Sequence, residues 1–127
     1  MINTSFIYAI LIVIIYILSG YEKLQNITGT AKSLKSKVPF SLPFNLFILA
    51  IVLTIFLEIF GSLIIIYSTW TNEYKNLAYY STLGLIGFTA LATMLYHYPP
   101  IGSKYYSFTK NIAIIGGLFL LADKFAN

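Results

Sequence analysis

The chain has 127 residues, of which 58% are hydrophobic and only 9% are charged, and its mean hydropathy is +0.81. A soluble domain carries about a quarter charged residues, so this composition excludes a protein with a large aqueous surface. The net charge of +4 is scattered, whereas a nucleic-acid binder gathers its basic residues on one soluble face. Because the chain has no cysteine, it supplies no disulfide, thiolate ligand or thiol redox pair. We therefore predict an integral, multi-pass membrane protein that lies in a lipid bilayer and binds no nucleic acid.

Four hydrophobic segments predict four transmembrane helices in a single domain, residues 1–127. Each has about the length that the hydrocarbon core requires. The predicted spans are residues 2–20, 44–67, 77–97 and 108–125.

The assignment of the first and fourth segments as membrane spans depends on further features of the sequence. The first favours a retained span over a cleavable signal peptide, because no basic region precedes it and no A-x-A-like site follows it. The fourth has an uncharged stretch, 111–122, of only about 18 Å at 1.5 Å per residue. It spans the bilayer if Lys110 and Lys124 extend to the headgroups or pack inside the bundle.

The connecting segments are polar and contain the turn and interface residues expected there. The stretch 25–37 is interpreted as a loop whose lysines act as a topology signal or attract anionic headgroups. Prolines 39 and 43 suit the end of this loop and the first turn of the second span. The aromatic residues around the second turn are typical of a membrane interface: Trp70, Tyr74, Tyr79 and Tyr80.

The lysines predict an orientation. With four spans, the first and third loops lie on one side, and they carry most of the lysines. Since cytoplasmic loops are enriched in lysine and arginine, this bias places both termini outside the cytoplasm.

Small and polar residues recur at helical spacing in each span. In hydrocarbon, helices associate through small residues that let backbones approach and through polar residues that bond between helices. This pattern predicts an all-α, four-helix transmembrane bundle with a polar line in its interior. The predicted helix-packing glycines are Gly20, Gly61, Gly87, Gly116 and Gly117.

Glu58 lies inside the second span. A carboxyl group there costs several kcal/mol if lipid surrounds it, so it should face the interior and find a partner. Its candidate partners lie near the ends of other spans: Lys23, His97, Lys110 and Asn111. Two interpretations stay open, namely a buried cluster that only holds the helices in register and a site for a proton or a ligand.

His97 and Lys23 have structural interpretations as well. His97 is the only histidine, and with Glu58 it would supply just two metal ligands, which rarely make a site. We therefore predict no metal site and favour an interfacial histidine. Lys23 is either a lysine extending to the headgroups at a helix end or a partner for Glu58. No nucleotide-binding, catalytic-triad or zinc motif is present, so catalytic residues are not assigned.

Several segments together resemble one family. Gly20-Tyr21-Glu22-Lys23-Leu24 is similar to the G-x-x-K-L signature that closes the first helix of DoxX-like proteins. Glu58-Ile59-Phe60-Gly61 resembles the E-x-x-G of their second helix. Residues 92–97 resemble the end of their third helix, and Asn111 with Gly116 and Gly117 resembles their fourth. The sequence differs after the second helix, where residues 68–70 stand in place of basic residues.

The resemblance implies a four-helix membrane bundle, in some members tied to thiosulfate or quinone oxidation. It implies a redox-associated, non-catalytic subunit with a quinone or similar lipid-soluble ligand near Lys23, Glu58, His97 and Asn111. The partners would be a membrane or soluble redox protein, or a second copy of the chain. The alternative is an adaptor, cargo-receptor-like or structural protein in which the polar cluster only holds the bundle together.

Overall fold

The computed structural model describes residues 4–96 and 101–126, and every regular element in these ranges is helical. The helix that contains Glu58 runs through three elements without a break, because its α-helical turns widen into one π-helical stretch. The elements are α1 (Thr4–Gln25), α2 (Ile27–Lys37), α3 (Phe44–Phe56), the π-helix η1 (Leu57–Gly61), α4 (Ser62–Thr71), α5 (Lys75–Tyr96) and α6 (Lys104–Ala126).

Four of the helices are long and apolar enough to cross a membrane, which confirms the predicted fold class. They are Phe6–Gln25, Phe44–Thr71, Lys75–Tyr96 and Lys104–Ala126. The fourth begins four residues earlier than predicted. Its 23 residues give a length of about 35 Å at 1.5 Å per residue, enough for the hydrocarbon core. The protein is therefore an integral, multi-pass membrane protein.

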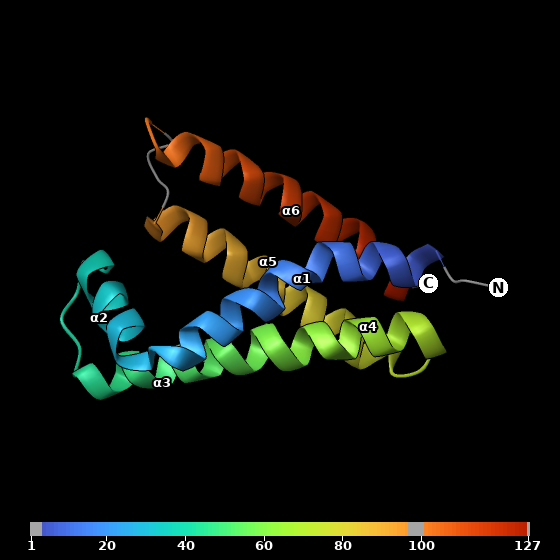
Figure 1. The fold of residues 1–127 in the computed structure, drawn as a ribbon, viewed down its shortest axis with the longest axis horizontal. Coiled ribbons are helices and arrows are strands. Elements are labelled where there is room, and N and C mark those ends of the chain that lie inside the picture. Colours follow the sequence, from blue (N-terminus) through green and yellow to red (C-terminus); the bar gives the residue numbers. More distant parts are fainter. Residues whose placement is uncertain (1–3, 97–100, 127) are drawn as a thin grey trace.

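The helices run along a common long axis (Figure 1). Helix α1 packs against the α3–η1–α4 helix, α5 pairs with α6, and the short α2 packs on α3. One end of the molecule, called here the α2 end, holds α2, the last turns of α1 and α5, and the first turns of α3 and α6. The opposite end, called the terminal end, holds the first described turn of α1 and the last of α6.

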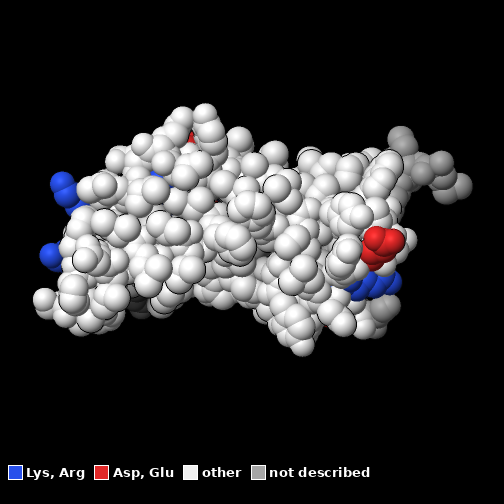
Figure 2. All heavy atoms as spheres, turned by 90° about the horizontal axis from the view of Figure 1, so that it is seen from below, with Lys and Arg blue, Asp and Glu red and all other residues white. Residues whose placement is uncertain are grey.

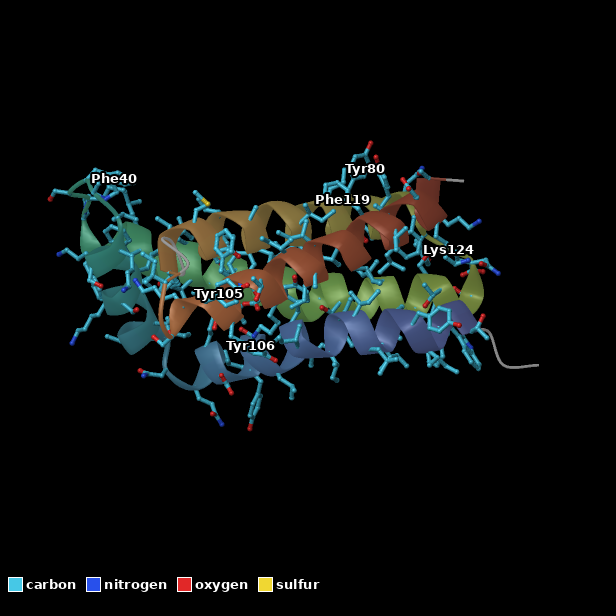
Figure 3. The ribbon with its side chains drawn as sticks, turned by 90° about the horizontal axis from the view of Figure 1, so that it is seen from above. Phe40, Tyr80, Tyr105, Tyr106, Phe119 and Lys124 are labelled. Carbon is cyan, nitrogen blue, oxygen red and sulfur yellow. The ribbon has the colours of Figure 1, made fainter. Side chains whose placement is uncertain are left out.

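On the face seen in Figure 2, most of the visible charged side chains lie toward these two ends, and the surface between them shows very few. Large apolar and aromatic residues project outward along the whole length, as lipid-facing side chains do. Tyr80 is 68% exposed and Tyr106 is 73% exposed, and both are labelled in Figure 3. An outer surface of this kind is stable in a bilayer and not in water.

The segment predicted as the first loop is instead largely helical, which corrects that prediction. Asn26 caps α2 by accepting a hydrogen bond from the Gly29 backbone N–H at 3.1 Å. Ile27, Ala31 and Leu34 recur at the spacing of one helix face and pack against α3. The lysines occupy the other face, so the average hydropathy of the segment concealed its amphipathic pattern.

The packing face of α5 also differs from the predicted one. The buried residues are Ala78, Thr82, Leu85, Ile86, Thr89 and Thr93, whereas Gly87 is exposed and a Cβ there would meet nothing within 4 Å. The same holds for Gly116 of α6. These two glycines make no intramolecular packing contact of the predicted kind, because the buried face of each helix lies about 100° or more around the axis.

Candidate functional site

The centre of the candidate site is an ion pair between α1 and η1. Lys23 Nζ lies 2.7 Å from Glu58 Oε1, and Glu58 is only 1% exposed. Lys23 also donates to Ser19 Oγ at 2.6 Å, and its ammonium group lies 5.5 Å from the centre of the Phe88 ring. The two charges compensate each other in a medium where either charge alone would be costly.

Local helix geometry brings this pair together. Glu58 lies in the π-helical stretch η1, and single π-turns inside α-helices occur frequently at functional sites. Across from it, Gly20 gives α1 its close approach: a Cβ at that position would lie 2.7 Å from Ile59 Cγ1 and 3.4 Å from Glu58 Cβ. A glycine one turn before Lys23 therefore lets the lysine reach the carboxylate.

A second set of polar contacts joins α5 to α1 and α6. The Tyr16 hydroxyl shares a hydrogen bond with Thr89 Oγ1. Asn111 Nδ2 donates to Thr93 Oγ1 at 3.0 Å, and Thr93 Oγ1 donates to the Thr89 backbone carbonyl at 2.6 Å. These contacts place hydroxyl and amide groups in the same half of the bundle as the ion pair.

Both sets of contacts border a small polar cavity of about 200 Å³. Its polar lining comes from α1, η1, α5 and α6: Tyr16, Ser19, Lys23, Glu58, Thr89, Lys110 and Asn111. A cavity of this size with several polar partners has room for a few water molecules.

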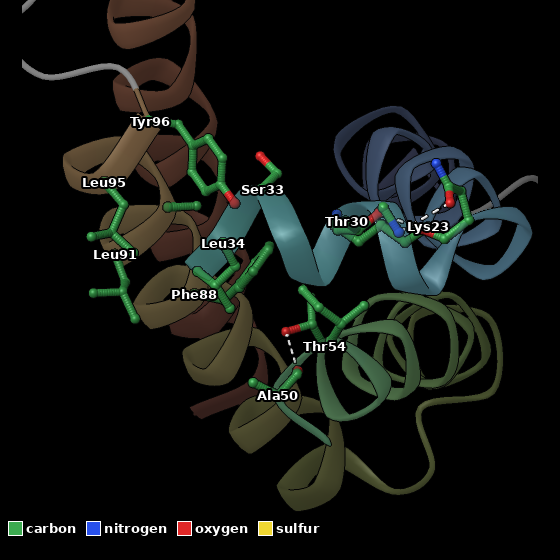
Figure 4. Close-up of a pocket in the computed structure, with 14 residues that line it drawn as sticks. Lys23, Thr30, Ser33, Leu34, Ala50, Thr54, Phe88, Leu91, Leu95 and Tyr96 are labelled. Atoms are coloured by element: carbon green, nitrogen blue, oxygen red, sulfur yellow. Dashed lines mark hydrogen bonds between the residues drawn. The ribbon is translucent and has the colours of Figure 1, made fainter. Parts of the chain in front are cut away.

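A larger pocket of about 540 Å³ lies beside it, between α2, α3 and α5 (Figure 4). Its walls are mostly apolar, with Leu34 of α2 opposite Leu91 and Leu95 of α5. Lys23, at the end of α1, lines this pocket as well as the polar cavity, as do Phe88 and Ala92. One lysine side chain thus lines the apolar pocket and pairs with the buried carboxylate.

Three of the four predicted site residues lie around the polar cavity. Lys23 and Glu58 are in direct contact, whereas Asn111 lines the cavity and bonds to Thr93 instead of to Glu58. His97 lies outside the described residues. Lys110, a predicted partner of Glu58, lines the cavity without a hydrogen bond or ion pair to that carboxylate.

Sequence reasoning missed part of the lining. Ser19 and Thr89 were not singled out, although Ser19 precedes Lys23 by one helical turn and Thr89 precedes Thr93 by one turn. That spacing was a usable signal. The wall supplied by α2 could not be foreseen, because that segment was interpreted as a loop.

Comparison with known families decides the identity of the chain. The DoxX family model matches residues 6–98. The chain belongs to the DoxX family. The match ends before α6, so it does not extend to the resemblance seen at Asn111, Gly116 and Gly117. No curated protein and no solved structure matches the chain.

The departure from the family pattern, predicted to follow the second span, lies inside it, because its helix continues to Thr71. Ser68 and Thr69, which stand where basic residues are often found, are each only 1% exposed near the end of α4. Trp70 is 58% exposed. A basic side chain at either of the first two positions would place a charge in the packed interior of the terminal end, which is costly. The small hydroxyl side chains of Ser68 and Thr69 carry no such charge.

Proposed function

We propose that this DoxX family protein is a redox-associated membrane subunit that holds a quinone or similar lipid-soluble ligand in its larger pocket. The observation that supports the proposal is the position of Lys23. Its side chain lines an apolar pocket of about 540 Å³, and its ammonium group is paired with a buried carboxylate. Small-molecule sites are typically apolar pockets of about 300–1,000 Å³ with a few placed polar groups.

The lining residues fit the two parts of such a ligand. Leu34, Leu91 and Leu95 offer an apolar surface for a tail. Lys23 is the cation in this wall, and an ammonium group has three N–H donors. Two of them bond to Glu58 and Ser19, which leaves a third for a ligand carbonyl oxygen. The pair with Glu58 keeps the ammonium group at the pocket wall instead of extended to the headgroups.

A bound quinone supplies the capacity to accept two electrons with two protons. The chain has no cysteine for thiol chemistry, and a partner protein is proposed to deliver the electrons. In this scheme Lys23 orients the ligand, and Glu58 holds Lys23 in place.

Filling the pocket tests the proposal. Ala92→Phe places a ring where Ala92 lines the pocket, and we expect it to weaken the binding of a short-chain benzoquinone at least about tenfold, a loss of about 1.4 kcal/mol. Ala90→Phe makes the same change at an exposed position of the same helix and should leave the dissociation constant unchanged. Binding that is equally strong in both variants, or absent from the unmodified protein, would contradict the proposal.

A second candidate function rests on a different observation, the pairing of the polar side chains with one another. Lys23 with Glu58, Asn111 with Thr93, and Tyr16 with Thr89 are contacts that hold helices together without any ligand. This favours a non-enzymatic adaptor or structural protein. Glu58→Gln separates the two candidates: a ligand site loses quinone binding while keeping its thermal stability, whereas an adaptor has no quinone binding to lose.

A further inference from the structure

Helix α2 has two different faces. Its apolar face is packed on α3, with Ala31 completely buried in a cluster with Phe47, Ile51 and Ile55. The rest of its circumference, called here the polar face, carries three exposed lysines, with Lys32 and Lys35 on one side of the apolar face and Lys37 on the other. The helix contains no Asp or Glu, and no carboxylate in the described part of the chain contacts these three lysines. The polar face therefore presents three positive charges without internal compensation.

The level of α2 in the membrane follows from its neighbours. The span in α1 ends at Gln25, just before α2, and the next span begins at Phe44. Because α2 connects these two span ends and its last turn contacts Phe44, the first residue of α3, and Tyr96, the last of α5, that turn is placed at the level of the lipid headgroups. Aromatic residues at span ends are typical of that level.

Two of the lysines are held there by such aromatic rings. Lys35 Nζ lies 6.0 Å from the ring centre of Phe44, the first residue of α3. Lys37 Nζ lies 5.7 Å from the ring centre of Tyr96, the last residue of α5. Contacts between a cation and an aromatic face at this distance are attractive, so both ammonium groups are positioned at the interface instead of extending freely into water.

The lysine face also borders the larger pocket. Ser33 of α2 and Tyr96 of α5 both line that pocket and lie near each other (Figure 4). The contact of Lys37 with Tyr96 spans the space between the same two helices. A headgroup bound at the lysines would therefore sit beside the opening of the pocket between α2 and α5.

We propose that the polar face of α2 binds the headgroups of anionic phospholipids, with Lys32 and Lys35 as the contacts on one side of the helix and Lys37 on the other. The lysines supply charge-assisted donors for phosphate oxygens, and their position at the headgroup level places them where lipid phosphates are most concentrated. A soluble acidic protein would have to compete for the same lysines with these concentrated lipid phosphates. The lipid is therefore the favoured occupant. This site is independent of the quinone ligand proposed above.

The experiment measures lipid binding to the purified full-length protein by native mass spectrometry. The protein in detergent is titrated with phosphatidylglycerol or with phosphatidylcholine of the same acyl chains. The unmodified protein should bind phosphatidylglycerol more tightly. Lys35→Gln with Lys37→Gln should weaken that binding by about 25-fold, since each lysine near the membrane surface contributes roughly fivefold in affinity for anionic lipid.

A matched pair of lysines at the terminal end provides the control. Lys75 and Lys124 are also exposed, and Lys75→Gln with Lys124→Gln removes the same total charge. We expect this control to bind phosphatidylglycerol within about twofold of the unmodified protein. Lys35→Arg with Lys37→Arg keeps the charge and should keep the binding, which separates loss of charge from damage to the fold.

Three results would overturn the proposal. One is an equal loss in the α2 variant and the terminal-end control, because net charge alone would then explain it. Another is equal binding of the two lipids by the unmodified protein. The third is binding of a poly-glutamate peptide that persists in phosphatidylglycerol nanodiscs, which would assign α2 to an acidic protein partner.

Discussion

The two ends of the bundle use different means to hold four helices together in lipid. Toward the terminal end, the buried side chains are mostly apolar, with Ile65 and Leu118 completely buried, and the polar ones among them are small hydroxyl groups such as that of Ser68. Toward the α2 end, the interior contains the ion pair of Lys23 with Glu58 and two cavities that share lining residues. The same bundle thus combines a mostly apolar half with a half that holds the buried ion pair.

This difference separates stability from binding. In hydrocarbon, burial of apolar side chains gives little driving force, and close packing and interhelical hydrogen bonds take its place. At the terminal end, close packing of side chains holds the helices together. The α2 end leaves space unfilled and tolerates a buried carboxylate, which is a functional-site hypothesis by default in a membrane. Four predictions test how far the two ends differ.

The largest effect is expected from breaking the ion pair. Glu58→Leu leaves Lys23, whose side chain is 21% exposed in the pair, without its carboxylate partner. Removing one partner of a buried pair typically costs about 3–5 kcal/mol. The melting temperature of the protein in detergent should therefore fall strongly.

The double change Lys23→Leu with Glu58→Leu is the control for this prediction. It removes both charges, and replacing a whole buried pair by apolar residues is often neutral or stabilising. The double variant should recover much of the lost stability. A double variant as unstable as Glu58→Leu alone would show that the pair does not act through charge compensation.

A smaller loss is expected from opening a hole in the packed end. Leu118→Ala removes a completely buried side chain and should cost about 2 kcal/mol, at the low end for such changes because lipid is already apolar. Leu34→Ala, at a half-buried wall of the larger pocket, should cost clearly less. The melting temperatures of the two variants are compared. A greater loss of stability in Leu34→Ala than in Leu118→Ala would contradict the expected difference in packing between the two ends.

The third prediction concerns the crossing of α1 and η1. The methyl group in Gly20→Ala would lie 2.7 Å from Ile59 Cγ1, so the helices must separate, at a cost of about 1 kcal/mol or more. This separation of α1 from η1 would also move Lys23 away from Glu58. Gly116→Ala meets no atom within 4 Å and should leave the melting temperature unchanged or slightly raised. Equal effects of the two substitutions would show that close approach at Gly20 is not needed.

The smallest effect on stability is expected from two cysteine substitutions that test which membrane face each end of the bundle occupies. Ser33 of α2 and Asn72, just after α4, are both exposed and lie at opposite ends of the bundle. Single cysteines at these positions should react with a membrane-impermeant thiol reagent from opposite faces. Because the native chain has no cysteine, the background is low. Labelling of both from one face would contradict the four-span bundle.

Two failures of sequence reasoning have a common physical origin. The segment 25–37 has the composition of a loop, and only its packing against Phe47 and Ile51 of α3 explains why it is helical. In α5, Gly87 and Thr93 both fit a plausible stripe, but the packed face passes through Thr89 and leaves Gly87 toward the lipid. In each case the sequence is compatible with more than one packing face, and contact with the neighbouring helix determines which face is buried.

Composition and hydrophobic length by themselves determined that the chain is a four-span membrane protein, because a bilayer requires about 20 apolar residues per span and leaves few alternatives. The sequence also marked Glu58 as a buried carboxylate in need of a partner. Only the tertiary structure decided that Lys23 is that partner, that Asn111 bonds to Thr93 instead, and that α2 forms a pocket wall. Those outcomes depend on the rotation and separation of packed helices, which residue spacing within one helix does not specify.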